Sequence, residues 1–415
     1  NDFNQPLGNI LDSLTNLQTL TFGREFNNGK KINDPLNMEK PLDTSLYNLT
    51  NLQTLTFGEQ FNQILGNSLD SLINLQTLTF GYNFRNKYNQ LNNSLDKLTN
   101  LQTLTFGYNF NQQLNNSLKK LTNLQTLTFG ETFNNLGYKL LDSLYNLVNL
   151  QTLNFGREFN IPLDNSLDKL TNLQTLRFVD EFGLGHFNQP LGNSLDSLIN
   201  LQTLTFGELF NQPLGNSLNG LTKLQTLTFG EQYKNSNFNQ SLGNSLDSLT
   251  NLQTLIFSKN FNQPLDNSLD SLINLQTLTF GEIFNQPLGN SLNRLTNLIS
   301  IDLPYNHSEN KKITVLIKKN IENIKKRENN WKRDGNTIRT TYTQKRLTNH
   351  QTQKNQNKVN KLKDIIAPYV IINNDKLPTE WDKTALYNNL NNNNNNKKNN
   401  NKKNNNKNNN KLKKK

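Results

Sequence analysis

The stretch LQTLTFGEIFNQPLGNSLNRLTN, residues 275–297, contains the features that decide the fold. In its first half, Thr277 and Thr279 alternate with Leu278 and Phe280 before Gly281. This period of two predicts a short strand with one buried face, which ends at the glycine. The first part of each unit is therefore expected to be extended.

The second half of the stretch predicts a turn followed by one short helical or 3₁₀ turn. Pro287 restricts the backbone after the strand, and the pair Asn290-Ser291 is a helix-start signal. Leu292 and Leu295 are three residues apart, so they fit one apolar face of a single turn. Each unit is expected to run strand, turn, short helix, turn.

The strand motif NLQTL or a near copy of it recurs twelve times. The copies begin at residues 16, 51, 74, 100, 123, 149, 172, 200, 223, 251, 274 and 297. The shortest unit has 23 residues, and longer units carry 3, 5 or 12 more, mostly between the Phe-Gly pair and the next Leu-Gly-Asn-Ser-Leu or its equivalent. One unit alone buries too little apolar surface to offset its ordering entropy, so the units must stack. We predict an α/β solenoid that is rich in β-structure, with a curved parallel sheet over residues 1–301 and short convex helical or 3₁₀ turns.

The repeat resembles the FNIP repeat, a leucine-rich-repeat relative of amoebal and giant-virus proteins. The resemblance rests on a Phe-Asn pair at fixed spacing after Leu-x-Phe, as in Phe261-Asn262 after Leu255–Phe257, and it covers residues 1 to about 301. It implies a substrate-recognition module of a ubiquitin-ligase adaptor, because similar proteins often carry an F-box ahead of the repeats. This sequence starts inside a repeat and shows no F-box. Relative to the common LxxLxLxxNxL pattern the asparagine comes two residues late, which leaves the partners of Asn285 open.

Composition excludes several classes of protein. The chain has no cysteine, so disulfide frameworks, thiolate metal sites and cysteine nucleophiles are impossible. No run of eighteen apolar residues occurs, and the first residues lack the zones of a secretory signal. We expect an intracellular protein that is not secreted, spans no membrane and is a monomer, and the resemblance to giant-virus proteins implies the host-cell cytoplasm.

No catalytic constellation is visible. The three histidines, His186, His307 and His350, are isolated, and the sequence has no HExxH motif and no nucleophile elbow. We therefore expect neither an enzyme nor a bound cofactor or metal.

The outward strand positions are almost uniformly threonine, as at Thr54 and Thr56 or Thr203 and Thr205. Threonine suits a pleated surface because it is β-branched and forms cross-strand pairs, so we interpret this ladder as structural. An ice-binding surface is the alternative, but the expected curvature and the charged loops disfavour it.

Partner contacts are expected where neighbouring units differ. The residue after Phe-Gly is often charged, which gives either a solvated rim or a mostly acidic strip that suits a basic protein partner. The unit at residues 172–190, NLQTLRFVDEFGLGHFNQP, departs most from the pattern. Either this unit is a contact site for a partner, or its sequence has drifted after duplication. The candidate contacts are Arg177, Asp180, Glu181, His186, Glu208, Glu231 and Glu282.

The two parts of the chain differ in charge. Residues 1–301 hold 17 Lys+Arg and 23 Asp+Glu, a net charge of −6, whereas residues 302–415 hold 27 and 9, a net charge of +18. Isoleucines at helical spacing predict a basic amphipathic capping helix within 302–330, with membrane-surface or nucleic-acid contact as alternatives. Residues 331–387 are expected to form a polar linker with a small apolar segment, and 388–415 a disordered Asn/Lys-rich tail.

Two functions follow from this organisation. We predict a non-enzymatic protein-interaction scaffold, with the ligase-adaptor role as its more specific form. The alternative is a structural or nucleic-acid-associated protein whose basic tail binds nucleic acid nonspecifically.

Overall fold

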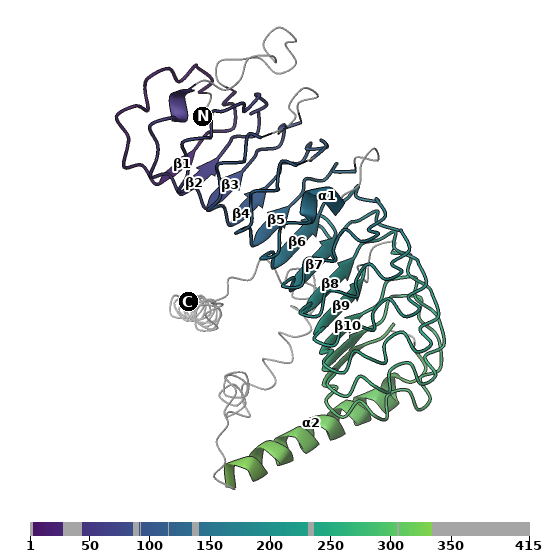
Figure 1. Ribbon diagram of the computed structural model, residues 1–415. Coiled ribbons are helices and arrows are strands. Elements are labelled where there is room, and N and C mark those ends of the chain that lie inside the picture. Colours follow the sequence, from purple (N-terminus) through teal and green to yellow (C-terminus); the bar gives the residue numbers. More distant parts are fainter. Residues whose placement is uncertain are drawn as a thin grey trace, which may run out of the picture. The chain divides into compact units, whose positions relative to one another are not determined.

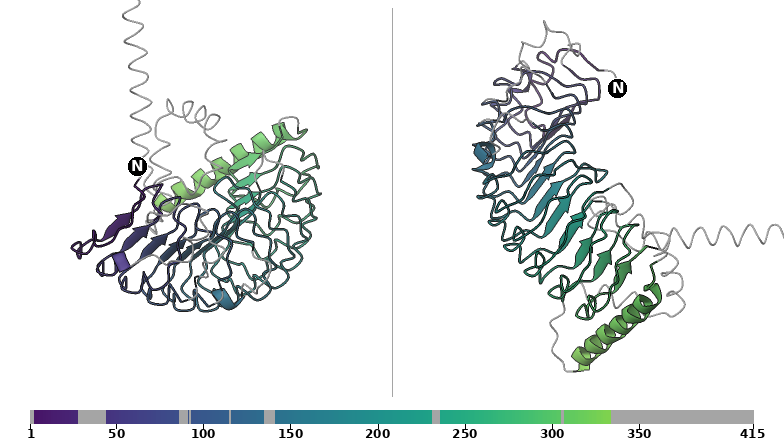
Figure 2. Two further views of the ribbon diagram at one scale, coloured as in Figure 1. Left: turned by 90° about the horizontal axis from the view of Figure 1, so that it is seen from above. Right: turned by 90° about the vertical axis from the view of Figure 1, so that its right-hand side faces the viewer.

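The computed structural model describes residues 3–27, 44–85, 91, 93–114, 116–134, 141–230, 236–304 and 307–333. Within this part, twelve short strands form one sheet in chain order, and the sheet curves around a concave face (Figures 1 and 2). The strands are β1 (Thr19–Thr21), β2 (Thr54–Thr56), β3 (Thr77–Thr79), β4 (Thr103–Thr105), β5 (Thr126–Thr128), β6 (Thr152–Phe155), β7 (Thr175–Phe178), β8 (Thr203–Phe206), β9 (Thr226–Phe229), β10 (Thr254–Ile256), β11 (Thr277–Thr279) and β12 (Ser300–Asp302).

Every neighbouring pair of strands is parallel, and equivalent residues of successive units lie side by side. Thr54 pairs with Thr77 and Leu55 with Leu78, for example. The leucine of each pair faces the interior, while the threonines on either side of it stay partly exposed. The predicted curved parallel solenoid is therefore confirmed, and the outward residues form two in-register columns.

Two columns of stacked phenylalanine rings form the centre of the solenoid. Within a unit the two rings, such as Phe106 and Phe110, stack at 3.8–4.2 Å between centroids. Rings of neighbouring units in the first column, such as Phe106 and Phe129, are 5.3–6.0 Å apart. Stacked rings of this kind contribute beyond the area that they bury. We call these two columns the phenylalanine spine.

The Phe-Gly glycine is required by close backbone stacking. A Cβ built on Gly107 would overlap the carbonyl oxygen of Gly81, and one on Gly130 would overlap that of Gly107. The same glycine recurs in most units, because any side chain there would push successive strands apart. Its role is thus to allow contact between units as well as to end the strand.

The asparagine that follows the second spine phenylalanine forms a ladder. Its Oδ1 accepts a hydrogen bond from the backbone N–H of the equivalent residue in the next unit, as Asn262 does from Asn285 at 2.9 Å. These bonds span 2.9–3.2 Å along the described repeats. The asparagine of the repeat therefore bonds to the backbone of the next unit through its side chain, and Asn285 takes part in this ladder through its own N–H. The asparagine ladder satisfies backbone donors that stacking would otherwise leave unpaired.

The convex side consists mainly of hydrogen-bonded turns rather than helices. In one unit, Ser68 N–H donates to Leu65 O and Leu72 N–H to Leu69 O, each three residues back. Among the described residues only η1 (Thr44–Leu46) and α1 (Leu141–Leu144) form regular helix there. In eight units the structure describes a left-handed residue at the start of this turn, glycine in six of them and aspartate at Asp164 and Asp266. Aspartate tolerates this conformation better than most residues.

A long helix, α2 (Asn310–Arg333), lies against the last strand (Figure 2). Ile313 joins the hydrophobic core, and Asn320 Nδ2 donates to the carbonyl oxygens of Leu295 and Leu298 at 3.0 Å. His307 stacks on Phe284 at 5.7 Å and so continues the spine by one ring. The helix predicted within 302–330 thus covers the open edge of the solenoid and extends slightly further along the chain.

Some sequence predictions lie outside the described residues. These are Glu231 and the linker and tail beyond Arg333. In the part of the chain that the structure does describe, no helix is long and apolar enough to cross a membrane.

Candidate functional site

The irregular unit places a group of ionisable side chains at the edge where the strands end. His186 Nδ1 lies 3.1 Å from Glu158 Oε2, and its Nε2 lies 3.4 Å from Arg157 Nε and 3.7 Å from Glu208 Oε1. Arg157 also forms an ion pair with Glu208 at 3.6 Å. Since the Nε–H of arginine can only donate, His186 Nε2 accepts and its Nδ1–H donates to Glu158. Three successive units thus meet in one network, which we call the central cluster.

The insertion beside this cluster is a small loop closed on itself by Asp180. The Asp180 carboxylate accepts hydrogen bonds from the N–H groups of Phe182 and Leu184 at 2.7 and 2.8 Å. The Asp180 N–H in turn donates to Leu184 O at 2.8 Å, and Gly183 takes a left-handed φ of 75°. Asp180 is buried, whereas Phe182 at the tip of the loop is 59% exposed. The loop therefore holds an aromatic side chain out toward solvent.

Glu131 lies next to this loop and has a perturbed acidity. The pKa of Glu131 is raised from 4.5 to about 7, chiefly by burial and also by the negative charges of Asp180 and Glu181. The Arg157 N–H, which donates to Glu131 Oε2 at 3.2 Å, and the Arg157 charge act in the opposite direction. Carboxylates thus gather closely enough at this point for one of them to hold its proton near neutral pH.

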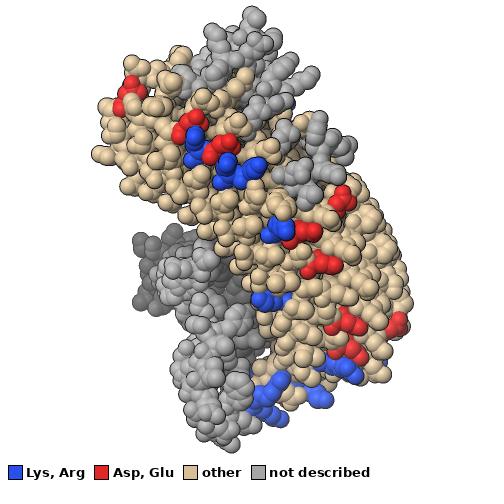
Figure 3. Space-filling model, in the orientation of Figure 1, with Lys and Arg blue, Asp and Glu red and all other residues tan. Residues whose placement is uncertain are grey.

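The remaining predicted contact residues occupy different places. Arg177 lies in the outward column of β7, in register with Asn154 on one side and Thr205 on the other. Glu208 belongs to the central cluster, whereas Glu282 lies on a distant unit and forms an ion pair with Lys259 at 3.1 Å. Figure 3 shows the charged side chains as a band across a surface that is otherwise uncharged. Arg177, Asp180, Glu181, His186 and Glu208 all belong to two neighbouring units, but their role as contacts stays a prediction.

The sequence placed Arg157 among the charged residues that follow Phe-Gly, but it did not reveal that Arg157, Glu158 and Phe182 belong to this site. Arg157 and Glu158 fill regular positions of an ordinary unit, and only stacking brings them to His186, 28 to 29 residues later. The length of the insertion was the one available signal for Phe182. No group of three or more metal-ligating side chains in the described residues is arranged to hold an ion.

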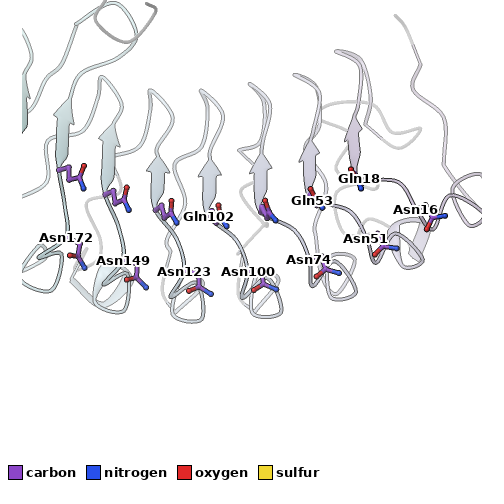
Figure 4. Close-up of a pocket in the computed structure, with 14 residues that line it drawn as sticks. Asn16, Gln18, Asn51, Gln53, Asn74, Asn100, Gln102, Asn123, Asn149 and Asn172 are labelled. Carbon is purple, nitrogen blue, oxygen red and sulfur yellow. The ribbon is translucent and has the colours of Figure 1, made fainter. Parts of the chain in front are cut away.

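A second feature is a groove of about 850 Å³ along the concave face. It follows the beginnings of strands β1 to β7 and is lined entirely by amide side chains (Figure 4). These come from the Asn-Leu-Gln segment of seven units: Asn16, Gln18, Asn51, Gln53, Asn74, Gln76, Asn100, Gln102, Asn123, Gln125, Asn149, Gln151, Asn172 and Gln174. We call this surface the amide groove.

Comparison with protein-family models and with curated proteins finds no match for this chain. Solved structures are similar to it. An internalin (inlF) from Listeria monocytogenes is 20% identical with a TM-score of 0.51, and the match covers 71% of this chain and 76% of the internalin chain. The circular LRR protein CroV588 is 28% identical with a TM-score of 0.48, over 74% of this chain and 46% of that one. The chain is thus a leucine-rich-repeat-type solenoid.

Proposed function

We propose that this solenoid is a non-enzymatic protein-recognition scaffold that binds a basic partner at the central cluster and the adjacent loop. The observation that carries the proposal is the exposed Phe182 beside a ring of charged side chains. Binding energy at protein interfaces is concentrated in a few aromatic and arginine side chains surrounded by polar groups. The other units of the solenoid repeat almost the same sequence, so this site differs chemically from the rest of the surface.

The charge of the site indicates the chemistry of the partner. Glu158 and Glu208 lie around His186 and Arg157, and the charges of Asp180 and Glu181 act on the neighbouring Glu131, so ionised carboxylates outnumber guanidinium groups in the cluster. A basic patch on a partner would meet a complementary potential, which raises the association rate and favours the correct register. We therefore expect binding to weaken as the salt concentration rises.

The more specific form of the proposal is a substrate-recognition module of a ubiquitin-ligase adaptor of the FNIP-repeat type. The Phe-Asn pairs support the resemblance, because the spine phenylalanines and the asparagine ladder give each residue of the motif a structural role. An adaptor would require an F-box or an equivalent ligase-binding segment in the full protein. Co-purification of ligase subunits with the full-length protein would test this form separately.

The test of the scaffold compares partner recovery by the wild type and by two matched variants. Phe182→Ala removes the exposed aromatic ring of the loop, and Ile283→Ala removes an apolar side chain, also about half exposed, on a distant unit. We expect Phe182→Ala to reduce the affinity for the bound partner roughly thirtyfold, as for an interface hot spot, and Ile283→Ala to leave it unchanged. Equal affinity for all three proteins would contradict the proposal.

A second candidate, nonspecific binding to nucleic acid, is favoured by the outward face of α2. Its apolar face packs on the solenoid, and the side chains of Lys312, Lys318, Lys319, Lys325 and Lys326 are exposed. Phosphate contacts release counterions, so binding to single-stranded DNA should weaken linearly with the logarithm of the salt concentration. Lys318→Glu combined with Lys325→Glu should reduce this slope, and no binding by the full chain at low salt would exclude this function.

A further inference from the structure

The amide groove has the properties of a binding site for a long uncharged ligand. All fourteen side chains that line it are asparagine or glutamine, so it presents no charge and no aromatic ring. This composition differs from the core of a protein interface, which is enriched in aromatic residues and arginine. It also lacks the lysines and arginines that bind nucleic acid.

The asparagines of the groove are held in fixed positions. In each unit the Nδ2 group donates to a backbone carbonyl of the preceding unit, at 2.8–3.0 Å for the six pairs from Asn51 to Asn172. Asn123 donates to Thr99 O, for example. The amide plane is thereby oriented by the stacking of the repeats, and the second N–H and the Oδ1 of each asparagine keep their hydrogen-bonding capacity.

The glutamines provide the open hydrogen-bonding capacity. Gln53, Gln76, Gln102, Gln125 and Gln151 are exposed, and their side chains form no hydrogen bond to any other described residue. Their main-chain carbonyls, by contrast, are each bonded to two N–H groups of the next unit, as Gln102 O is to Gln125 and Thr126. The backbone below each side chain is thus fixed while the amide remains available. Each amide can donate and accept at once, which suits a partner with neighbouring hydroxyl groups.

The spacing of the groove is that of the sheet. Because the strands pair in register, equivalent amides recur at about 4.8 Å, and seven of them extend over about 30 Å. An extended peptide advances by only about 3.3 Å per residue, and its side chains vary. Successive residues of a peptide therefore do not coincide with successive amides of the groove. A β-1,4-linked glucose chain is extended, uncharged and rich in hydroxyl groups. Successive rings are turned by about half a turn, so equivalent hydroxyl groups recur at every second ring, a repeat close to two strand spacings.

We infer that the amide groove binds a neutral β-linked polysaccharide, with one Asn-Leu-Gln segment serving about one sugar ring. The ligand would lie along the concave face across β1 to β7. This site is separate from the central cluster, and its occupation by a glycan does not depend on the protein-recognition function proposed above.

The experiment measures the affinity of the full chain for β-1,4-linked glucose oligomers of two to six rings, by calorimetry or ligand-observed NMR. Affinity should rise about fivefold with each added ring, since each ring adds about one net hydrogen bond. The α-1,4-linked oligomers of equal length, which curve, and a neutral Asn/Gln peptide serve as competing ligands. Absence of binding at millimolar concentration, equal binding of the α-linked series, or preference for the peptide would each overturn the inference.

Two matched variants locate the site. Gln76→Ala, Gln102→Ala and Gln125→Ala together remove three amides inside the groove, whereas Lys97→Ala, Lys119→Ala and Lys120→Ala remove three exposed side chains of the convex turns that do not line it. The first variant should lose at least tenfold in affinity for the six-ring oligomer, and the second should bind like the wild type. If the triple variant fails to fold, Gln102→Glu replaces it, because a charge in the neutral groove should reduce binding while retaining the side-chain volume. Unchanged affinity of the folded groove variant would contradict the assignment.

Discussion

The unit that contains β4 and the unit that contains β7 have the same interior and different edges. In the first, Phe106 and Phe110 stack at 3.9 Å; in the second, Phe178 and Phe187 stack at 4.2 Å although five more residues lie between the two phenylalanines. The additional residues form the loop closed by Asp180, outside the core. A solenoid therefore accepts insertions where they leave the contacts between units intact, and these insertions are where distinct chemistry arises.

The largest expected effect tests whether the two interiors are equivalent. Phe110→Ala and Phe187→Ala each empty a fully buried position of the same spine column, so each should destabilise its unit by about 3–5 kcal/mol. Urea unfolding together with hydrogen exchange of the neighbouring strands would measure both losses. Phe182→Ala at the exposed loop tip is the control, with an effect within about 0.5 kcal/mol. A much smaller loss for Phe187→Ala would show that the irregular unit packs differently.

The second effect concerns the loop that distinguishes the irregular unit. Asp180→Ala leaves two backbone N–H groups without their acceptor and should destabilise the loop by about 1–3 kcal/mol. Hydrogen exchange at Phe182 and Leu184 should accelerate, while the strand amides of β7 keep their protection. Asp180→Asn retains one acceptor oxygen and should lie between the wild type and the alanine variant. Slow exchange in all three proteins would mean that the carboxylate does not hold the loop.

A smaller increase in stability is expected when the missing asparagine of the ladder is restored in the unit that contains β3. Arg85 occupies an asparagine-ladder position, and arginine has no acceptor for the N–H of the next unit. Arg85→Asn should therefore stabilise the protein by about 1 kcal/mol, seen as a higher unfolding temperature. Arg85→Ala removes the same arginine without supplying an acceptor and is the control. Identical stabilities of the two variants would remove the ladder as the explanation.

The last effect depends on pH. The pKa of Glu131 is near 7 in the folded protein and 4.5 in its ordinary state, so between these values the folded state binds more protons than the unfolded state. Stability should accordingly fall as pH rises through this range. Glu131→Gln removes the titration and should raise the unfolding temperature at pH 8 but leave it nearly unchanged at pH 4. Equal shifts at both pH values would contradict the buried, proton-holding role.

Most of the architecture could be predicted because each unit repeats the same short pattern. The alternation around Leu278 predicted a strand, and the 23-residue period predicted parallel stacking in register. The short convex helices were predicted less well, since Ser68 and Leu72 form separate turns with carbonyls three residues back and do not extend into helix. In the candidate site, the irregular sequence identified Arg177 and His186, but not Arg157 and Glu158, whose own unit is regular.

The sequence by itself determined that leucines and phenylalanines of successive units share one interior, because a single unit cannot bury enough apolar surface to fold alone. It also determined which edge carries the insertions. Only the tertiary structure decided that the Asn262 side chain accepts a hydrogen bond from the Asn285 N–H. It also showed that a side chain on Gly107 would overlap the Gly81 carbonyl, and that His186 contacts Glu158 and Glu208. These contacts join residues 22 to 28 positions apart, so their geometry is set by how one unit lies on the next and not by any local pattern.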